Sequence, residues 1–300
     1  MRYLIAIACC GLFVAPSLAQ SNFGGPIEVQ QIAPGIQMLV AGSNAILVTG
    51  RREAVLIDGL VSAQAEPLKT KVQSLTALPV TYVINTHYHG DHTGGNAVFR
   101  ALGAKVISTD AAAKTMARET PTTRGTMNPP LPEAARATQT FTGTKTLKAA
   151  NHTFRMTQMP VSHTDGDMVI FIPQANMLIM GDLHHSNEYP VYDTTAGCQC
   201  GSYDGNLDVY RRVLKMGNEK TIIVPGHGKV TNKAELRVYV KMLEKIRDEV
   251  TAMIQAGKSA DEVVAAKLLA NDKAPHPGGP DNRDSFVRVL YEALKTGRGK

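Results

Sequence analysis

The sequence predicts an α/β (α+β) fold in which two mixed β-sheets pack as a sandwich and helices cover their outer faces. Short β-rich segments recur at hairpin spacing, and in both halves of the chain such strands are followed by a helical pattern. Hydrophobic residues make up 43% of the 300 positions, which is enough for a sizeable core and argues against disorder. No internal repeat at solenoid periods competes with this interpretation.

The first half begins with short strands separated by glycine-rich turn signals such as Pro34-Gly35 and Gly42-Ser43-Asn44. A buried apolar strand and alternating helices then follow. We expect strands at 36–40, 45–48 and 54–57, a helix at 62–76, a strand at 80–84, a helix at 95–102, a strand at 105–108 and a helix at 109–118.

The second half starts after a proline-rich loop at 120–138. Two hairpins, one long polar loop and several amphipathic helices are expected there. They comprise a hairpin around Asn151, a hairpin around Gln174-Ala175-Asn176, a loop from Leu183 to Tyr203, a helix at 207–214, a strand at 221–224, and helices at 232–256, 260–270 and 284–295. Residues 20–300 are predicted to form a single domain with a C-terminal helical extension.

Residues 1–19 have the pattern of a cleavable secretory signal peptide. Arg2 supplies the positive region, Leu4 to Val14 is apolar, and Ser17-Leu18-Ala19 is a small-x-small cleavage site. A lipid anchor at Cys9 or Cys10 is disfavoured because the apolar run before them is too short. We therefore expect a periplasmic or secreted protein with no membrane association after cleavage. The formal charge of +6 is modest and spread out, so no nucleic-acid partner is expected.

The chemistry of the chain is concentrated in one histidine-rich segment that follows the apolar run 80–84. Three imidazoles and one carboxylate fall within six positions, in Thr86-His87-Tyr88-His89-Gly90-Asp91-His92. His87 and His89 are two residues apart, so in an extended segment both project from one side. A turn at Gly90 can direct Asp91 and His92 elsewhere. Imidazole nitrogen and carboxylate oxygen are ligands that zinc takes, and two directions suit two ions.

Further His and Asp residues recur just past predicted strands. His163 follows the strand 153–159, Asp182 follows 177–180, and His227 follows 221–224; each has glycine nearby. Ligand sites in sheet proteins cluster outside strand ends. Each residue alone could be an ordinary loop residue, but these three and the histidine segment after 80–84 make four such coincidences in one chain, which favours a shared site.

The string H-x-H-x-D-H, the lone His163, and the later Gly-Asp and Gly-His pairs resemble the metallo-β-lactamase superfamily from about Ala45 to Gly228. The resemblance implies a four-layer αβ/βα sandwich and a hydrolase that uses a hydroxide held between two Zn²⁺ ions. By the same resemblance the metal ligands are His87, His89 and His163 for one ion, Asp91, His92 and His227 for the other, and Asp182 between them. Asp91 is in addition the predicted catalytic residue.

One position departs from the best-known β-lactamases, which have Cys or Ser where this chain has Asp182. An Asp there resembles glyoxalase II and acyl-homoserine lactonases. The lysine that helps some β-lactamases bind the substrate carboxylate would fall near His185 and is missing. A lactonase or glyoxalase II-like thioesterase is therefore the first alternative function. An iron-dependent sulfur dioxygenase and a non-catalytic periplasmic metal-binding partner are alternatives of another class, and Fe is the alternative metal.

The loop from Leu183 to Tyr203 is expected to wall the pocket of a small-molecule substrate. The candidate substrate contacts are His184, Tyr189, Tyr192 and Tyr203. Cys198 and Cys200 could form a redox pair, an extra metal site or a stiffened loop. Asp58 is interpreted as a turn residue rather than a support for the site, and His185 as a solvated loop residue.

Overall fold

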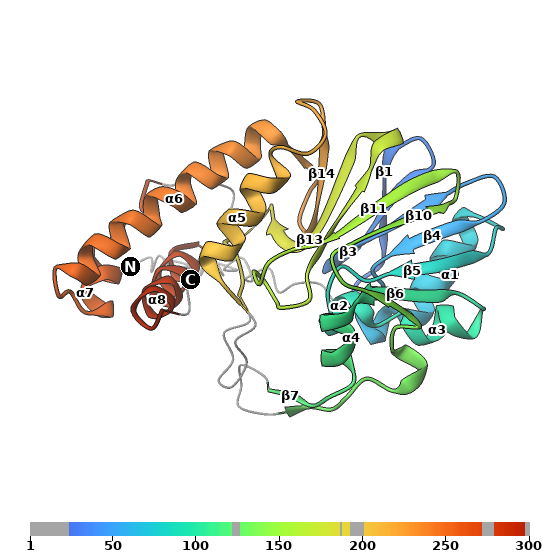
Figure 1. Ribbon diagram of the computed structural model, residues 1–300, viewed down its shortest axis with the longest axis horizontal. Coiled ribbons are helices and arrows are strands. Elements are labelled where there is room, and N and C mark those ends of the chain that lie inside the picture. Colours follow the sequence, from blue (N-terminus) through green and yellow to red (C-terminus); the bar gives the residue numbers. More distant parts are fainter. Residues whose placement is uncertain (1–23, 122–126, 187, 193–200, 272–278, 298–300) are drawn as a thin grey trace, which may run out of the picture.

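The computed structural model describes residues 24–121, 127–186, 188–192, 201–271 and 279–297, and contains two β-sheets that pack face to face (Figure 1). The first sheet has the strand order β1-β2-β3-β4-β5-β6-β9. Its strands are antiparallel from β1 to β4 and parallel from β4 onward. They span Glu28–Ala33, Ile36–Ala41, Ser43–Thr49, Ala54–Ile57, Val80–Ile84, Lys105–Thr109 and Gln139–Phe141.

The second sheet has the order β10-β11-β12-β13-β14-β15, and all its neighbours are antiparallel except the parallel pair β13–β14. Its strands span Thr144–Ala149, His152–Gln158, Met168–Ile172, Met177–His185, Ile222–His227 and Thr231–Asn232. A separate short pair, β7 (Thr120–Pro121) and β8 (Met127–Asn128), lies beyond the first sheet.

Helices cover the outer face of each sheet, as Figure 1 shows. On the first sheet, Leu68 of α1 and Phe99 of α3 share a buried cluster with Leu56 of β4. On the second, Leu207 of α5 and Leu243 of α6 share a buried cluster with Leu178 of β13. The helices are α1 (Ala65–Leu75), α2 (Gly90–Thr93), α3 (Asn96–Ala101), α4 (Asp110–Met116), α5 (Tyr203–Val213), α6 (Lys233–Gln255), α7 (Ala260–Ala265) and α8 (Gly279–Lys295). Single 3-10 turns lie at Ser62–Gln64, Glu133–Ala135 and Pro173–Ala175.

The layers follow from the two-residue period of the strands. In β4, Val55 and Ile57 belong to the cluster between the sheets, whereas Ala54 and Leu56 belong to the cluster under the helices. The facing sheet contributes Ile170 and Ile179 to the inner cluster. A strand buried on both faces reads as a continuous apolar run, and Ala54–Ile57 is buried throughout. The predicted sandwich of two mixed sheets flanked by helices is confirmed.

Several element boundaries differ from the sequence-based expectation: α5 and α8 start earlier, α7 ends earlier, and β7 and β8 form within the expected loop at 120–138. Two further differences affect the site. Strand β13 continues from Met177 through Asp182 to His185 instead of ending at Met180, because its parallel pairing with β14 resumes after irregular steps at Gly181. A one-turn helix, α2, starts at Gly90, where only a turn was expected. Among the described residues, no helix is long and apolar enough to cross a membrane.

Candidate metal centre

The segment Thr86–His92 leaves the end of β5 and turns sharply into α2. The amides of His92 and Thr93 donate to the carbonyl oxygen of His89, which begins the helical turn. His87 precedes the turn and His92 follows it, and their ring planes are inclined by 48° to each other. Both rings are almost fully buried. The expected change of direction at Gly90 therefore arises from the start of a helix.

His163 lies in the bend between β11 and β12. Asp167 stabilises this bend, because its carboxylate accepts hydrogen bonds from the amide and hydroxyl of Thr164. Burial raises the pKa of Asp167 to about 7, although these hydrogen bonds oppose the shift. The bend places Nε2 of His163 2.9 Å from Nδ1 of His89.

Asp182 and His227 lie inside β13 and β14, not after them as the sequence suggested. The ladder between these strands is irregular around Gly181, whose φ is +52°, a conformation that favours glycine. A Cβ at position 226 would lie 2.0 Å from Oδ1 of Asp182, so only glycine there leaves room for the carboxylate. The two strands therefore present ligand atoms at a local opening of the sheet.

All seven predicted ligand residues come together in two donor groups that share Asp182. The first group comprises His87, His89, His163 and Asp182, and the second comprises Asp91, His92, Asp182 and His227. Within each group the donor atoms lie within 4.8 Å of one another. Residues of both sheets contribute to each group, so the site lies at one edge of the sandwich.

Asp182 is the central carboxylate of the cluster. Its Oδ1 lies 3.0 Å from Nε2 of His92, and its Oδ2 lies 3.5 Å from Nε2 of His163 and 3.4 Å from Nε2 of His227. Asp91 is placed at the side of the second group, with Oδ2 3.1 Å from Nε2 of His227. Asp91 thus has the position of a ligand to the second group.

The imidazoles of the two groups differ in their protonation. Burial lowers the pKa of His87 well below 6.5 and that of His163 to about 3, and neighbouring imidazoles add to both shifts. Burial also opposes the charged forms of His92 and His227, but the neighbouring carboxylates, Asp182 first among them, together outweigh it. The pKa of His92 is raised well above 6.5 and that of His227 to about 10.

Burial alone would raise the pKa of Asp182, yet attraction to His92 and His227 holds it well below 3.8. The same balance holds for Asp91, whose pKa is also well below 3.8 because His92 and His227 outweigh the effect of burial. Protons on these two imidazoles therefore neutralise the buried carboxylates in the metal-free chain. A divalent cation can supply the same positive charge, so cation binding would displace those protons.

Three of the donor rings are oriented by a contact on the side away from the cluster. Nδ1 of His163 donates to the carbonyl of Val191 at 2.7 Å, and Nδ1 of His227 donates to the carbonyl of Gly42 at 2.9 Å. Nδ1 of His87 lies 3.1 Å from Oγ1 of Thr86. Such contacts fix the tautomer that leaves Nε2 directed at the metal position.

Asp58 supports the site, and its interpretation as a simple turn residue is wrong. It is buried, and its Oδ2 accepts from Nδ1 of His92 at 2.9 Å. Its other contacts are with Thr86, whose amide donates to Oδ1 and whose hydroxyl donates to Oδ2. Its φ of +60° is uncommon for a non-glycine residue. The sequence signal for this role is the pair Asp58-Gly59, which follows the buried strand β4. Because β4 pairs in parallel with β5, this pair and the histidine segment leave the sheet at the same edge.

His185 is also part of the site rather than a solvated loop residue. It is buried, its Nε2 lies 3.4 Å from Oδ2 of Asp182, and its ring is 4.8 Å from that of His227. Its Nδ1 lies 2.9 Å from Oε1 of Glu188. Burial opposes the charged form of His185, but Asp182 and Glu188 together outweigh it and raise the pKa of His185. The extended β13 strand explains the error, because it carries this residue back over the cluster.

The predicted substrate contacts lie elsewhere in the structure. His184 is buried between Tyr210 and Tyr239, and burial lowers its pKa to about 3. The three tyrosines of the loop are buried in the cluster under the helices: Tyr189, Tyr192 and Tyr203. Tyr189 stacks on Phe286 of α8, and the hydroxyl of Tyr203 donates to the carbonyl of Leu243. These contacts indicate packing roles. Cys198 and Cys200 lie outside the described residues.

Comparison with known proteins identifies the family. A family model described as the metallo-β-lactamase superfamily matches residues 39–227, which contain all seven donor residues. The chain therefore belongs to the metallo-β-lactamase superfamily. A metallo-β-lactamase type 2 from Bacillus sp. (strain 170) is 28% identical over 199 residues, covering 65% of this chain and 70% of the relative.

Solved structures show the same fold at low sequence identity. A metallo-β-lactamase from Pontibacter korlensis has a TM-score of 0.59 and 19% identity, and the match covers 73% of this chain and 99% of that one. A sec-alkyl sulfatase has a TM-score of 0.65 and 16% identity, with 89% of this chain and 50% of the other covered.

Proposed function

We propose that the chain is a zinc-dependent hydrolase that holds two metal ions and opens a carbonyl of the amide or ester type. The observation that carries this proposal is the pair of donor groups that share Asp182. In this proposal His87, His89 and His163 hold one ion, while Asp91, His92 and His227 hold the other. Three protein ligands and a shared carboxylate leave space for a water at each ion, as a catalytic site requires.

The residues fit such ions chemically. Nε2 of His87 is buried without a hydrogen-bond partner among the described residues, and its nearest carboxylate oxygen, Oδ2 of Asp182, is 3.7 Å away. A buried polar atom without a partner is costly, and a metal ion between these donors would satisfy it. Nitrogen and oxygen donors suit zinc; iron also takes imidazole and carboxylate ligands and remains the alternative metal.

When bound, the two ions would act as Lewis acids and lower the pKa of water to about 7. The protein residues orient the ligands and limit solvent access. Asp58 holds His92 in one tautomer, and Val191 and Gly42 do so for His163 and His227. His185 lies beside Asp182 and His227, where it can help to hold the shared carboxylate in place.

We propose that esters, lactones or thioesters are better substrates than β-lactams. Asp182 adds negative charge between the metals, which reduces the positive charge available to an amide-derived anion. The lysine that binds the substrate carboxylate in some β-lactamases would fall near position 185, and this chain has His185 there. The lost cationic contact should weaken binding of a β-lactam carboxylate by roughly the 1.5–3 kcal/mol of a charged hydrogen bond.

A substrate panel tests the proposal. Zinc-loaded protein is assayed on a cephalosporin, a homoserine lactone and a thioester, before and after chelation. We expect detectable but modest β-lactam turnover, faster turnover of another class, and loss of all activity on chelation with recovery on adding Zn²⁺. A kcat/KM of about 10⁶–10⁸ M⁻¹s⁻¹ on penicillins or carbapenems would instead indicate a true β-lactamase. Activity that persists in metal-free protein would overturn the proposal.

Residues 1–19 have the features of an export signal, and we propose that the mature chain acts outside the cytoplasm on a small molecule. That compartment contains β-lactams and little glutathione thioester, which favours the non-glutathione substrates in the panel. Amino-terminal sequencing of protein from an exporting host would give Gln20 as the first residue. An intact Met1 in the exported fraction would contradict this.

A further inference from the structure

A pocket adjoins the turn that carries the first donor residues. Tyr88, His89 and Gly90 form part of its lining, and the end of α4, the β7–β8 pair and residues 129–132 form the rest. Its volume is about 290 Å³. His89 belongs both to this lining and to the first donor group, so the pocket adjoins the metal centre at this residue.

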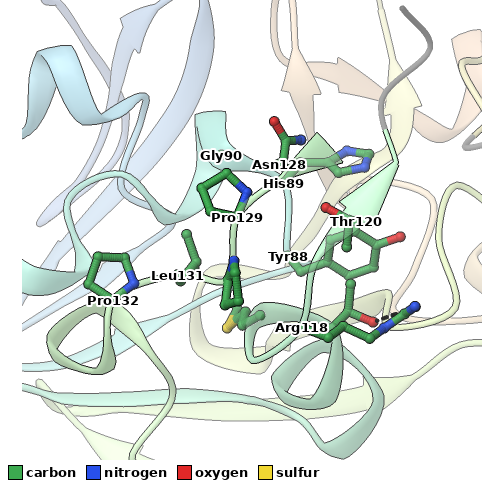
Figure 2. Close-up of a pocket in the computed structure, with 12 residues that line it drawn as sticks. Tyr88, His89, Gly90, Arg118, Thr120, Asn128, Pro129, Leu131 and Pro132 are labelled. Carbon is green, nitrogen blue, oxygen red and sulfur yellow. Dashed lines mark hydrogen bonds between the residues drawn. The ribbon is translucent and has the colours of Figure 1, made fainter. Parts of the chain in front are cut away.

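The pocket has a mainly apolar wall. Figure 2 shows Pro129, Leu131 and Pro132 on one side of the view and Tyr88 and Arg118 on the other. The amide of Leu131 donates to the carbonyl of Met116 at 2.8 Å, which ties the proline-rich segment to the end of α4. Proline fixes its own backbone φ, so the three prolines limit the conformations open to this wall.

Arg118 is the one Lys, Arg, Asp or Glu residue in the lining. Its side chain has one hydrogen bond within the described residues, a long one of 3.4 Å from Nη2 to Oγ1 of Thr115. A guanidinium has five N–H donors, so most of them can bind a ligand. Thr120 and Asn128 supply further polar groups near the same pocket.

We propose that this pocket binds the non-reacting end of the substrate and that Arg118 binds a carboxylate on that end. The inference rests on the proposed function, because it places the scissile carbonyl at the metal centre next to His89. The substrate class is an ester, lactone or thioester whose acyl or leaving portion carries an apolar segment ending in a carboxylate.

The charge and shape of the pocket favour a carboxylate. One guanidinium balances one negative charge, whereas a phosphate dianion calls for more cations than the lining provides. Arginine binds carboxylates through two parallel hydrogen bonds, which gives direction as well as affinity. The apolar wall of Met116, Leu131 and the prolines then accommodates the carbon chain between the carboxylate and the reacting group.

A binding experiment tests this subsite without relying on catalysis. Isothermal titration calorimetry on zinc-loaded protein compares 4-phenylbutyrate with its neutral amide, 4-phenylbutyramide. The variants are Arg118→Gln and, as a matched control, Arg155→Gln, because Arg155 is an exposed arginine on β11. We expect the native chain and the control to prefer the carboxylate, and Arg118→Gln to bind it about tenfold more weakly or worse.

Carboxylates can also bind zinc directly, and the variant separates the two modes. Binding at the metals would persist in Arg118→Gln, and an unchanged Kd would overturn the proposal. A third probe, 4-phenylbutyl sulfate, tests the choice of anion; tighter Arg118-dependent binding of the sulfate would overturn the assignment to carboxylates. Zinc content and Tm should be the same in the native chain, Arg118→Gln and Arg155→Gln, because both arginines are exposed.

Kinetics extend the test to the reaction. Mono-(4-nitrophenyl) glutarate and 4-nitrophenyl butyrate share a leaving group and differ in the terminal carboxylate. We expect Arg118→Gln to raise KM for the glutarate and to leave both constants for the butyrate unchanged. If neither ester is hydrolysed, the proposed function fails for esters while the calorimetry still decides on the subsite. Equal effects on both esters would overturn the role of Arg118.

Discussion

At the scale of single residues, the site is organised by polar contacts that the ligand motif does not reveal. Asp58 lies at the end of β4 and holds His92, although the two residues are 34 positions apart. The sequence identified the seven donor residues because their spacing is local or family-specific. It did not identify Asp58 and His185, whose roles depend on strand pairing and on the length of β13.

The variant Asp58→Asn removes the charge opposite His92 and keeps the side-chain shape. We expect zinc affinity to fall about 10–100-fold, the usual effect of losing a ligand-supporting partner. Competition with a chromogenic chelator measures the affinity. The matched control is Asp208→Asn, which breaks an exposed ion pair with Arg212 and should leave affinity unchanged. An unaltered zinc affinity in Asp58→Asn would show that the carboxylate does not orient His92.

The packing role of Tyr203 gives a second prediction at this scale. Its hydroxyl donates to the carbonyl of Leu243 at 2.6 Å in a buried setting. We expect Tyr203→Phe to lower the free energy of unfolding by about 1 kcal/mol and to leave substrate preference unchanged. Urea unfolding and the substrate panel measure the two effects. A changed preference with native stability would restore the sequence-based role of substrate contact.

At the scale of secondary-structure elements, the parallel pair β13–β14 delivers Asp182 and His227 from within the sheet. The sequence placed both residues after strands, because a Gly-Asp or Pro-Gly pair normally ends a strand. In the structure the glycines instead open the ladder locally and allow it to continue. Local turn signals therefore pointed to two residues that the structure places in the donor groups, but they misplaced the strand ends by several residues.

The variant Gly226→Ala tests this arrangement. The added Cβ would lie 2.0 Å from Oδ1 of Asp182, so the shared carboxylate must move. We expect loss of most bound zinc and a lower Tm. Gly90→Ala is the matched control, since nothing lies within 4 Å of its added Cβ and its φ is not positive. Full zinc retention in Gly226→Ala would mean that Asp182 has freedom to relocate.

At the scale of the whole molecule, each donor group takes residues from both halves of the sandwich. His87 and His92 follow the first sheet, whereas His163, Asp182 and His227 belong to the second. The apolar pattern of the strands predicted the layers because burial follows period and composition. The meeting of the two halves at one edge followed from family resemblance, since no local rule sets the distance between remote strands.

Because metal ions would join the two halves, zinc should stabilise the whole fold, and the effect should depend on pH. Folding raises the pKa values of His92 and His227 above the value of about 6.5 that a histidine has in the unfolded chain. Protonation of these histidines therefore stabilises the metal-free fold fully at pH values below about 6.5. This contribution is lost as the pH rises through the folded-state pKa, which is about 10 for His227. Zinc must displace those protons, so its affinity increases as pH rises. We expect the Tm difference between zinc-loaded and chelated protein to widen from pH 6 to pH 9.

Differential scanning fluorimetry measures the Tm difference between zinc-loaded and chelated protein. When free zinc is 100 times Kd, binding should raise the free energy of unfolding by about 2.7 kcal/mol. In Asp182→Asn the shared carboxylate is lost, so the stabilisation should be much smaller at every pH. A Tm gap that narrows with rising pH would contradict the proton balance assigned to the two histidines.

The most direct measurement is anomalous X-ray diffraction at the zinc absorption edge from crystals of the zinc-loaded chain. We predict two peaks beside Asp182, one among His87, His89 and His163 and one among Asp91, His92 and His227. In Asp182→Asn crystals the peak of the second group should weaken most. A map with no peak at this edge of the sandwich, or with zinc bound only elsewhere on the chain, would contradict the two-metal centre.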